Sequence, residues 1–248
     1  MTKIIEVIDL RKSFKEKEVL KGINLSVNEG EIYALLGSNG SGKTTMINIL
    51  STILSKDSGQ AFIDGYEVGG NPQEVRQLIS LTGQFAALDE MLTGRENIEM
   101  MAKLARVKDW KARAQELLTQ VSMHEAADER VSTYSGGMKR RIDVAMGLVA
   151  RREILFLDEP TTGLDPEARN EIYELVEELT KTGVTIFLTT QYLQEAEKLA
   201  DHIAILHEGK ISKEGSLEKL QEEHSHLGEK PSLEEIFLDV IIKKEVYV

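Results

Sequence analysis

The sequence contains no cysteine among its 248 residues. Disulfide bonds, thiolate metal sites and cysteine nucleophiles are therefore excluded. Long apolar runs are also missing, because the longest are about five residues and a membrane-spanning helix needs about 20. The start, Met1–Glu6, lacks the apolar segment of a signal peptide. We therefore expect a cytoplasmic chain that reaches a membrane only through another protein.

Basic residues are outnumbered by acidic ones. The chain has 30 Lys and Arg against 42 Asp and Glu, which gives a net charge of −12. Such an acidic balance argues against nucleic acid as a partner and against direct adsorption on anionic lipid. A basic patch, Lys139–Arg141 with Arg151 and Arg152, departs from this trend. We interpret it as a solvated helix face or as an edge that faces a nucleotide.

Glycine is concentrated in one informative segment, residues 37–44. It follows the apolar run Ile32–Leu36 and precedes a helical pattern that starts near Met46. Strand, glycine-rich turn and helix in this order form the setting of a P-loop. Glycines let successive N–H groups surround a phosphate, and the helix directs its positive end there. The residues expected around a nucleoside triphosphate are Gly37, Ser38, Asn39, Gly40, Ser41, Gly42, Lys43, Thr44 and Thr45.

Two side chains of this segment have specific chemistry. Lys43 can reach the outer phosphates, and the hydroxyl of Thr44 can bind Mg²⁺. The alternative is a flexible glycine turn, which the flanking strand and helix make much the weaker interpretation. The segment therefore predicts binding of a nucleoside triphosphate, but not what the binding drives.

A second apolar run, Ile154–Leu157, ends in Asp158 and Glu159. A buried strand that ends in aspartate can place the carboxylate beside the Mg²⁺ of a P-loop. Glu159 faces a different direction and can polarise an attacking water as a general base. The alternative is a strand that ends in a solvated acidic turn, which is much less expected in a chain that already has a P-loop.

Residues Ser135–Gly137 open a predicted helix. Ser135 is a suitable N-cap, and the free N–H groups of the two glycines make a second anion site. As a helix start the segment is ordinary. In a chain with a P-loop it suggests a second phosphate-binding site.

The remaining patterns indicate an α/β fold. Ile32–Leu36, Ile154–Leu157 and Val184–Leu188 have the continuous apolar character of buried parallel strands. Residues 3–14 and 18–27 alternate around a turn and predict an antiparallel β layer.

Helical patterns fill two further regions. From about residue 86 to 150 almost nothing resembles a strand, so we expect a helical lobe inserted in the α/β core, with Met91, Met100 and Met101 packed inside it. An apolar helical stripe follows Pro231. The polar segment before that stripe, Glu222–Lys230, is predicted to be a linker whose two histidines, His224 and His226, are solvated rather than metal-binding.

The order of these segments, with Gly163-Leu164-Asp165 after the carboxylate pair Asp158-Glu159, resembles the nucleotide-binding domain of ABC transporters over essentially the whole chain. The resemblance implies a P-loop NTPase fold with a mainly parallel sheet core, an antiparallel β layer and an inserted helical lobe. We expect one domain, 1–248. Its parts would be an α/β core from 1–85 and 151–215, a helical subdomain from 86–150 and a helical tail from 216–248.

The resemblance also implies roles for single residues. Gln84 corresponds to the Q-loop glutamine, which senses Mg²⁺ and water and relays to the membrane partner, and Phe14 to the aromatic residue that stacks on adenine. Asp165 corresponds to the aspartate that contacts the other subunit's P-loop, and it is also a good N-cap before Pro166. In the family, Ser135–Gly137 completes the ATP site of a second copy. The chain would therefore bind ATP and Mg²⁺ and work as a dimer, with a homodimer expected.

Two positions depart from the family pattern. Met138 follows the two glycines where glutamine is commoner, and Gln191 stands where most members have the switch histidine. A glutamine amide can donate a hydrogen bond to a γ-phosphate, but it cannot carry a proton near pH 7. We therefore assign catalysis mainly to Glu159 and expect Gln191 to be a neutral contact, with reduced turnover left open.

A narrower resemblance rests on the segments Gly83–Ala87, Leu92–Asn97, Thr189–Leu193 and Pro231–Phe237. They resemble the daunorubicin-resistance type of drug-exporter ATPase, including the glutamine at 191. This implies a motor subunit for efflux of a drug or other amphiphile through a separate ABC-2-type permease. Two alternatives stay open: a regulatory module that closes on ATP with little hydrolysis, and a soluble ABC protein that does not transport.

Overall fold

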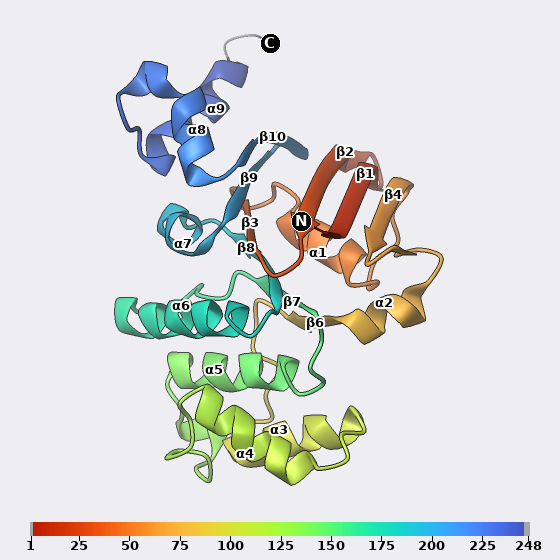
Figure 1. Cartoon of the computed structure of the whole chain (residues 1–248), viewed down its shortest axis with the longest axis vertical. Coiled ribbons are helices and arrows are strands. Elements are labelled where there is room, and N and C mark those ends of the chain that lie inside the picture. Colours follow the sequence, from red (N-terminus) through yellow and green to blue (C-terminus); the bar gives the residue numbers. More distant parts are fainter. Residues whose placement is uncertain (1, 246–248) are drawn as a thin grey trace.

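In the computed structural model, which describes residues 2–245, a mostly parallel six-stranded sheet runs through the centre (Figure 1). Met1 and residues 246–248, the end of the predicted tail, lie outside that range. The strands lie in the order β10-β9-β3-β8-β7-β6, and only the β9–β10 pair is antiparallel. The bounds are β3 (Ile32–Leu36), β6 (Ile79–Thr82), β7 (Ile154–Asp158), β8 (Thr185–Thr190), β9 (His202–His207) and β10 (Lys210–Gly215).

The three predicted parallel strands, β3, β8 and β7, are neighbours in the middle of this sheet. All residues of these three strands are buried, as expected of strands covered on both faces. Successive side chains alternate between the faces: Tyr33 and Leu35 belong to one apolar core, and Ile32, Ala34 and Leu36 to the other. The predicted α/β class with a mainly parallel sheet is confirmed.

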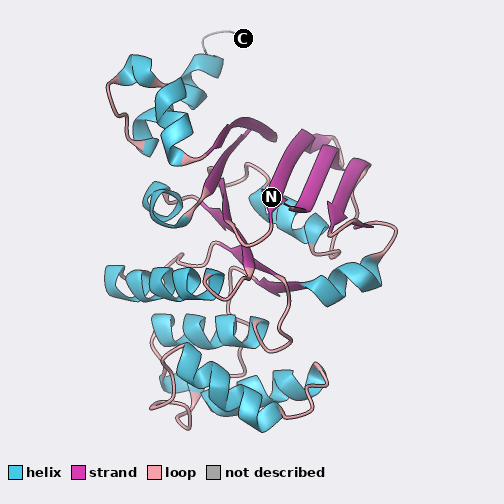
Figure 2. Cartoon of the chain, in the orientation of Figure 1, coloured by secondary structure: helices cyan, strands magenta, loops and turns pink. Residues whose placement is uncertain are grey.

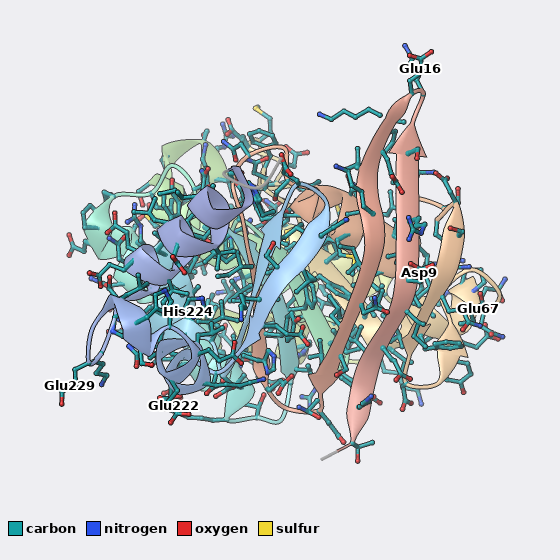
Figure 3. The ribbon with its side chains drawn as sticks, turned by 90° about the horizontal axis from the view of Figure 1, so that it is seen from above. Asp9, Glu16, Glu67, Glu222, His224 and Glu229 are labelled. Atoms are coloured by element: carbon teal, nitrogen blue, oxygen red, sulfur yellow. The ribbon has the colours of Figure 1, made fainter. Side chains whose placement is uncertain are left out.

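A second, antiparallel sheet has the strand order β2-β1-β4-β5 and packs with α1 and α2 over one face of the central sheet. The predicted hairpin is present, since Phe14 pairs with Lys17. Glu16 stands at its tip, beyond the body of the molecule (Figure 3). The bounds are β1 (Lys3–Phe14), β2 (Lys17–Asn28), β4 (Ser58–Ile63), β5 (Tyr66–Glu67), α1 (Lys43–Leu50) and α2 (Pro72–Leu78).

The other face of the central sheet is covered by helices (Figure 2). Helices α6 and α7 contact the sheet, α5 lies against α6, and α3 and α4 lie beyond α5 (Figure 1). Between residues 86 and 150 the described structure is helical apart from loops and one isolated bridge, Thr93–Arg130. The helices are α3 (Gly94–Leu104), α4 (Trp110–Gln120), the 3₁₀ turn η1 (Val131–Thr133), α5 (Gly136–Gly147), α6 (Pro166–Thr180) and α7 (Leu193–Leu199).

Two of the three methionines expected to pack inside the lobe do not. Met91 is 71% exposed and Met100 is 37% exposed, whereas Met101 packs against the core. Met91 lies in the loop before α3, where no helix periodicity fixes the direction of its side chain. That part of the prediction was wrong.

The C-terminal region forms two helices, α8 (Leu217–Glu223) and α9 (Leu233–Glu245), with a 3₁₀ turn η2 (Ser225–Leu227) between them. Leu233, Ile236 and Val240 of the predicted stripe are buried. The segment Glu222–Lys230 is not simply a linker, because it contains the end of α8 and η2.

The prediction that His224 is solvated was wrong. The side chain is 4% exposed, its Nδ1 lies 2.8 Å from the carbonyl oxygen of Leu220, and its Nε2 lies 4.0 Å from a carboxylate oxygen of Asp239. His226 lies 3.3 Å from the same carboxylate. Figure 3 shows His224 among these helices, while Glu222 and Glu229 point outward. The histidines were misjudged because their charged neighbour, Asp239, belongs to the following helix α9.

Candidate nucleotide-binding site

The glycine-rich segment connects the carboxyl end of β3 to the start of α1. Its backbone needs glycine at two points. Gly40 has φ of +79° and Gly42 has φ of +115°, both in the region that favours glycine. A Cβ atom on Gly42 would lie 2.8 Å from Cδ2 of Leu20, so the packing against β2 excludes a side chain there as well. The sequence thus folds into a tight turn that ends at the N-terminus of a helix.

Lys43 is the first residue of α1, and its side chain is 4% exposed. Its ammonium donates hydrogen bonds to the carbonyl oxygens of Gly37, at 2.8 Å, and Ser38, at 3.2 Å. The same nitrogen lies 3.2 Å from Oε1 of Glu159. The lysine is therefore held inside the turn, where three oxygens balance its charge.

A cavity of about 470 Å³ opens at this turn. It brings together the turn, the proposed adenine contact Phe14, the glutamine Gln84 and the carboxylate Glu159. Lys17 and Val19 of β2 also line it, and sequence analysis did not name them. The predicted residues that line it are Phe14, Asn39, Gly40, Gly42, Lys43, Thr44, Thr45, Gln84 and Glu159.

The side chain of Glu159, like that of Lys43, has three polar partners. Its Oε2 accepts hydrogen bonds from Nε2 of Gln84 and Oγ1 of Thr162, both at 3.2 Å, while Oε1 faces Lys43. The side chain is 8% exposed. Its backbone has φ of +48° and donates from N to the carbonyl oxygen of Thr189 at 3.0 Å. These contacts direct the carboxylate toward the turn that Lys43 occupies.

Asp158 ends β7 and is 4% exposed. It accepts a hydrogen bond from Oγ1 of Thr189 on the neighbouring strand β8, at 2.5 Å. This threonine, which also meets the backbone N–H of Glu159 at 3.2 Å, holds both carboxylate-bearing residues. Sequence analysis quoted Thr189 only as part of a motif. Its position two residues before Gln191, at the end of an apolar run, was the available signal.

The donor atoms fit ATP with Mg²⁺. The hydroxyl of Ser41 is buried and has no hydrogen-bond partner among the described residues, as expected of a group that waits for an anionic oxygen. Thr44 presents an exposed hydroxyl at the cavity, Gln84 an amide oxygen, and Asp158 a carboxylate at the end of its strand. Hydroxyl, amide and carboxylate oxygens are the ligands that Mg²⁺ prefers.

Phe14 ends β1, and its ring is 46% exposed at the rim of the cavity. The ammonium of Lys12 lies 5.6 Å from the ring centre. An aromatic face left this open beside a phosphate-sized turn is available for stacking on a flat ring.

Ser135–Gly137 does not line the cavity. Ser135 caps α5 as predicted, since its Oγ accepts from the N–H of Met138 at 3.2 Å. A Cβ on Gly137 would lie 2.7 Å from Cβ of Ala168, so glycine permits close packing against the start of α6. The helix α6 is capped by Asp165, whose Oδ1 accepts from the N–H of Ala168 at 2.9 Å. These two helix starts lie together, separate from the P-loop of the same chain.

Gln191 lies between the end of β8 and the start of α7, and its side chain is half-buried. It does not line the cavity in this structure. The turn around it is fixed locally, because the N–H of Tyr192 donates to Oγ1 of Thr190 at 2.9 Å.

One member of the basic patch, Arg140, does not lie on a solvated face, whereas the side chain of Arg151 is 69% exposed. Arg140 is 5% exposed, and its Nη1 donates to Oδ2 of Asp143 at 3.0 Å. Burial lowers the pKa of Arg140 and raises the pKa of Asp143. Lys139 pairs with Glu90 at 2.5 Å. The prediction was wrong for Arg140 because a run of charges does not reveal which member faces inward on a helix.

Residues 20–162 match the family model described as ABC transporter. That match spans more than half of the chain and includes the turn, Gln84, Ser135–Gly137 and the carboxylate pair. The chain belongs to the ABC transporter family. It carries the ATPase domain of this family, as the resemblance predicted.

Several relatives show a more specific similarity within this family. The chain is 49% identical over 203 residues to a daunorubicin resistance ATP-binding protein of Streptomyces coeruleorubidus, covering 81% of this chain and 63% of that protein. It is 44% identical over 225 residues to the daunorubicin/doxorubicin resistance ATP-binding protein of Streptomyces peucetius, covering 89% and 67%. The linearmycin resistance ATP-binding protein of Bacillus subtilis is 38% identical over 210 residues, covering 84% and 68%. The chain thus spans about two thirds of the length of the relatives it matches.

Solved structures agree on the fold. An ATP-binding subunit of an ABC transporter superposes with a TM-score of 0.82 at 27% identity, covering 96% of this chain and 99% of that one. An ATP-binding cassette solved as a dimer in a post-hydrolysis state with ADP and Pi gives 0.76 at 27% identity, covering 86% and 98%. The predicted ABC ATPase fold is confirmed. Among residues 2–245, no helix has both the length and the apolar character that a membrane span requires.

Proposed function

We propose that this chain is the ATP-binding and ATP-hydrolysing motor subunit of an exporter whose permease is a separate membrane protein. The observation that carries the proposal is the cavity in which one carboxylate, Glu159, lies 3.2 Å from the P-loop lysine through one oxygen and 3.2 Å from a glutamine amide through the other. Such a group has the parts that phosphoryl transfer to water requires: an anion cradle, a base and a group that orients the nucleophile.

The proposed roles follow from the contacts. The N–H groups of the turn and Lys43 bind the β- and γ-phosphates of ATP, and the negative phosphates draw the ammonium away from Glu159. The freed carboxylate accepts a proton from the attacking water, which Gln84 orients from the other side. Thr44, Asp158 and Gln84 would hold Mg²⁺, which when bound would neutralise charge on the phosphate oxygens. Gln191 completes the γ-phosphate contacts as a neutral amide.

The working unit in this proposal is a dimer of two such chains. Ser135–Gly137 lies away from the chain's own P-loop, so it is free to bind the ATP of a second copy through the N-terminus of α5. Asp165, at the neighbouring helix start, faces the same partner. A dimer solved for a structural neighbour with ADP and Pi supports this arrangement. ATP then joins the two chains, and hydrolysis separates them.

The names of the relatives and the exposed side chains of the helical lobe support a permease and an efflux role. Three large apolar side chains on or beside the lobe are open to solvent: Phe85 is 84% exposed, Met91 is 71% exposed and Leu104 is 70% exposed. Exposed apolar side chains of this kind suit a protein partner. We propose an ABC-2-type permease as that partner and a drug or another amphiphile as cargo, with the chain on the cytoplasmic side of the membrane.

The substitution Glu159→Gln tests the proposal directly. It keeps the shape of the side chain and removes the base, so we expect ATP turnover to fall by about 10²-fold or more. ATP binding should persist, and the variant should accumulate as an ATP-bound dimer in size-exclusion chromatography with light scattering. Unchanged turnover together with a monomer in ATP would contradict the role of Glu159.

A regulatory module that closes on ATP without hydrolysis is the second candidate, and Gln191 favours it. A glutamine cannot take a proton from the reaction. Steady-state ATPase assays of the wild type beside Gln191→His distinguish the two. The motor proposal expects sustained turnover by the wild type and at most a modest gain from histidine. Turnover that appears only in the histidine variant would favour the module.

A further inference from the structure

The segment that carries Gln84 is held at both ends by one ion pair of α5. Nη1 of Arg140 donates a hydrogen bond to the carbonyl oxygen of Gly83 at 2.7 Å. Oδ1 of Asp143 accepts one from the N–H of Ala87 at 3.1 Å. The two side chains are joined to each other at 3.0 Å. Only three residues, Gln84, Phe85 and Ala86, lie between the two points of attachment.

Two of the residues between these points differ in their contacts. The amide of Gln84 reaches Glu159 at 3.2 Å, whereas Phe85 is 84% exposed. Because both ends are fixed, a small displacement of α5 has to move the glutamine amide with respect to the carboxylate. The ion pair thus controls a distance within the proposed catalytic group without touching ATP or water itself.

Stability does not explain this pair. The side chains of Arg140 and Asp143 are each 6% exposed, and burial works against the charge of both. Nε and Nη2 of Arg140 have no hydrogen-bond partner among residues 2–245. Removing two charges from water costs several kcal/mol each, and an incompletely bonded pair repays little of that. A buried pair of this kind is better explained by the geometry that it imposes on Gly83 and Ala87.

The helix that carries the pair also carries the second anion site. Arg140 follows Ser135, the N-cap of α5, by five positions, and an α-helix rises about 1.5 Å per residue. The N-terminus of α5 and the attachment to Gly83 are therefore parts of one rigid element, with about 7 Å of helix between them. A force on the N-terminus moves the attachment as well.

We propose that Arg140 and Asp143 are positioning residues that set Gln84 against Glu159 and couple its position to the N-terminus of α5. When Ser135–Gly137 binds the ATP of the partner copy, α5 shifts, and the pair carries Gln84 with it in the chain's own site. One site therefore reports its state to the other through the backbone of residues 83–87. This inference rests on the roles proposed above for Gln84, Glu159 and Ser135–Gly137.

A double-mutant cycle in the full chain tests it. Arg140→Gln releases Gly83, Asp143→Ala releases Ala87, and Gln84→Ala removes the group being positioned. Each release should lower kcat about tenfold, the scale of a displaced catalytic group. KM for ATP should stay within about twofold, since the P-loop is untouched. In the Gln84→Ala background the same releases should change kcat by less than about twofold, because the residue they act through is gone.

Arg113→Gln is the matched control. Arg113 is also a buried arginine of the lobe, and it binds the two residues that follow α5, through the carbonyl oxygens of Leu148, at 2.6 Å, and Val149, at 3.4 Å. These hydrogen-bond partners lie outside residues 83–87. Its effect on kcat should be the same with and without Gln84→Ala. Arg140→Lys keeps a donor and the charge, so it should recover part of the lost kcat, and it provides a folded variant if Arg140→Gln does not fold.

The outcomes separate the claims. Multiplicative effects of Arg140→Gln and Gln84→Ala, or equal behaviour of Arg113→Gln, would overturn the positioning role while leaving the ATPase proposal intact. If Arg140→Gln fails to fold, the effects on kcat with and without Gln84→Ala are compared for Asp143→Ala and Arg140→Lys instead. If Gln84→Ala alone leaves kcat unchanged, the role of Gln84 fails first, and the positioning role fails with it. If only Glu159→Gln lost kcat, Glu159 would keep its role as the base. The roles proposed for Gln84, Arg140 and Asp143 would then be excluded.

Discussion

Lys43 shows how one residue serves two partners in turn. In this structure its ammonium is bonded to the carbonyl oxygens of Gly37 and Ser38 and paired with Glu159. A buried ammonium needs such oxygens, because an unpaired buried charge is very costly. The phosphates of ATP offer stronger acceptors at the same place. The carboxylate of Glu159 therefore holds the lysine in a position from which it can meet a phosphate.

Replacing Lys43 by alanine should weaken ATP binding. The loss of charge-assisted bonds to phosphate amounts to about 2 kcal/mol, or roughly thirtyfold in Kd. Isothermal titration with a non-hydrolysable ATP analogue measures it. Lys17→Ala is the control, because Lys17 lines the same cavity from β2 but makes no bond to the P-loop carbonyls. An equal loss in both variants would mean that only the local charge matters.

At the residue scale the sequence predicted more about the P-loop than about its surroundings. Lys43 and Glu159 were found because motifs fix their neighbours along the chain. Thr162 and Thr189, which orient the carboxylates, were not found. The hydroxyl of Thr189 acquires its partner Asp158 only when strands β7 and β8 pair, and the hydroxyl of Thr162 reaches Glu159 only in the turn that follows β7.

Among the elements, α3 has the most explicit start signal. Thr93 accepts from the N–H of Glu96 at 3.1 Å, and the Glu96 carboxylate accepts from the N–H of Thr93 at 2.8 Å. This is a capping box, in which two otherwise unpaired N–H groups are satisfied reciprocally. The helix is thereby fixed at the entrance to the lobe, beside the isolated bridge from Thr93 to Arg130.

Thr93→Ala should therefore lower the free energy of unfolding by about 1 kcal/mol, the usual cost of a lost N-cap. Chemical denaturation followed by circular dichroism measures the change. Thr119→Ala is the comparison, because Thr119 lies inside α4 and bonds only the carbonyl oxygen of Gln115. We expect that substitution to be neutral or slightly stabilising, since alanine is the better helix former. A smaller loss for Thr93 than for Thr119 would contradict the capping role.

Elements were predicted well where the period was unambiguous and long. The buried strands β3, β7 and β8 were expected, but β9 was not, although Ile203–Leu206 is an apolar run of similar character. β10 is polar and only partly buried, so nothing in its composition separates it from a loop. It exists because its backbone pairs with β9 at the edge of the sheet. The periodicity of a single sequence does not reveal which segments pair as strands.

At the scale of the whole molecule, the P-loop and Ser135–Gly137 belong to different regions of one chain. A single copy cannot bring them to the same ATP, because Ser135–Gly137 does not line the chain's own cavity. Two copies related by a two-fold axis would present each region to the other, as an isologous contact requires. The separation of the two regions within one chain therefore supports the proposed assembly.

Ser135→Arg tests that requirement. The bulky cation blocks the N-terminus of α5 without touching the P-loop, so Kd for ATP of the single chain should change by less than about twofold. In the Glu159→Gln background the ATP-dependent dimer should disappear from light-scattering traces. Ser216→Arg is the control, because Ser216 caps α8 in the same way, accepting from Lys219 at 3.3 Å, at the far end of the chain. A dimer that persists in Ser135→Arg would exclude this serine from the contact.

The backbone of Glu159 has a positive φ, which is unfavourable for a residue other than glycine. A side chain with a Cβ at φ of +48° is strained, and glycine would relieve that strain. The chain therefore sits below its own stability optimum at the residue assigned to the chemical step. Selection of variants for thermal stability should therefore yield substitutions at Glu159. The most heat-stable variants would then bind ATP without hydrolysing it.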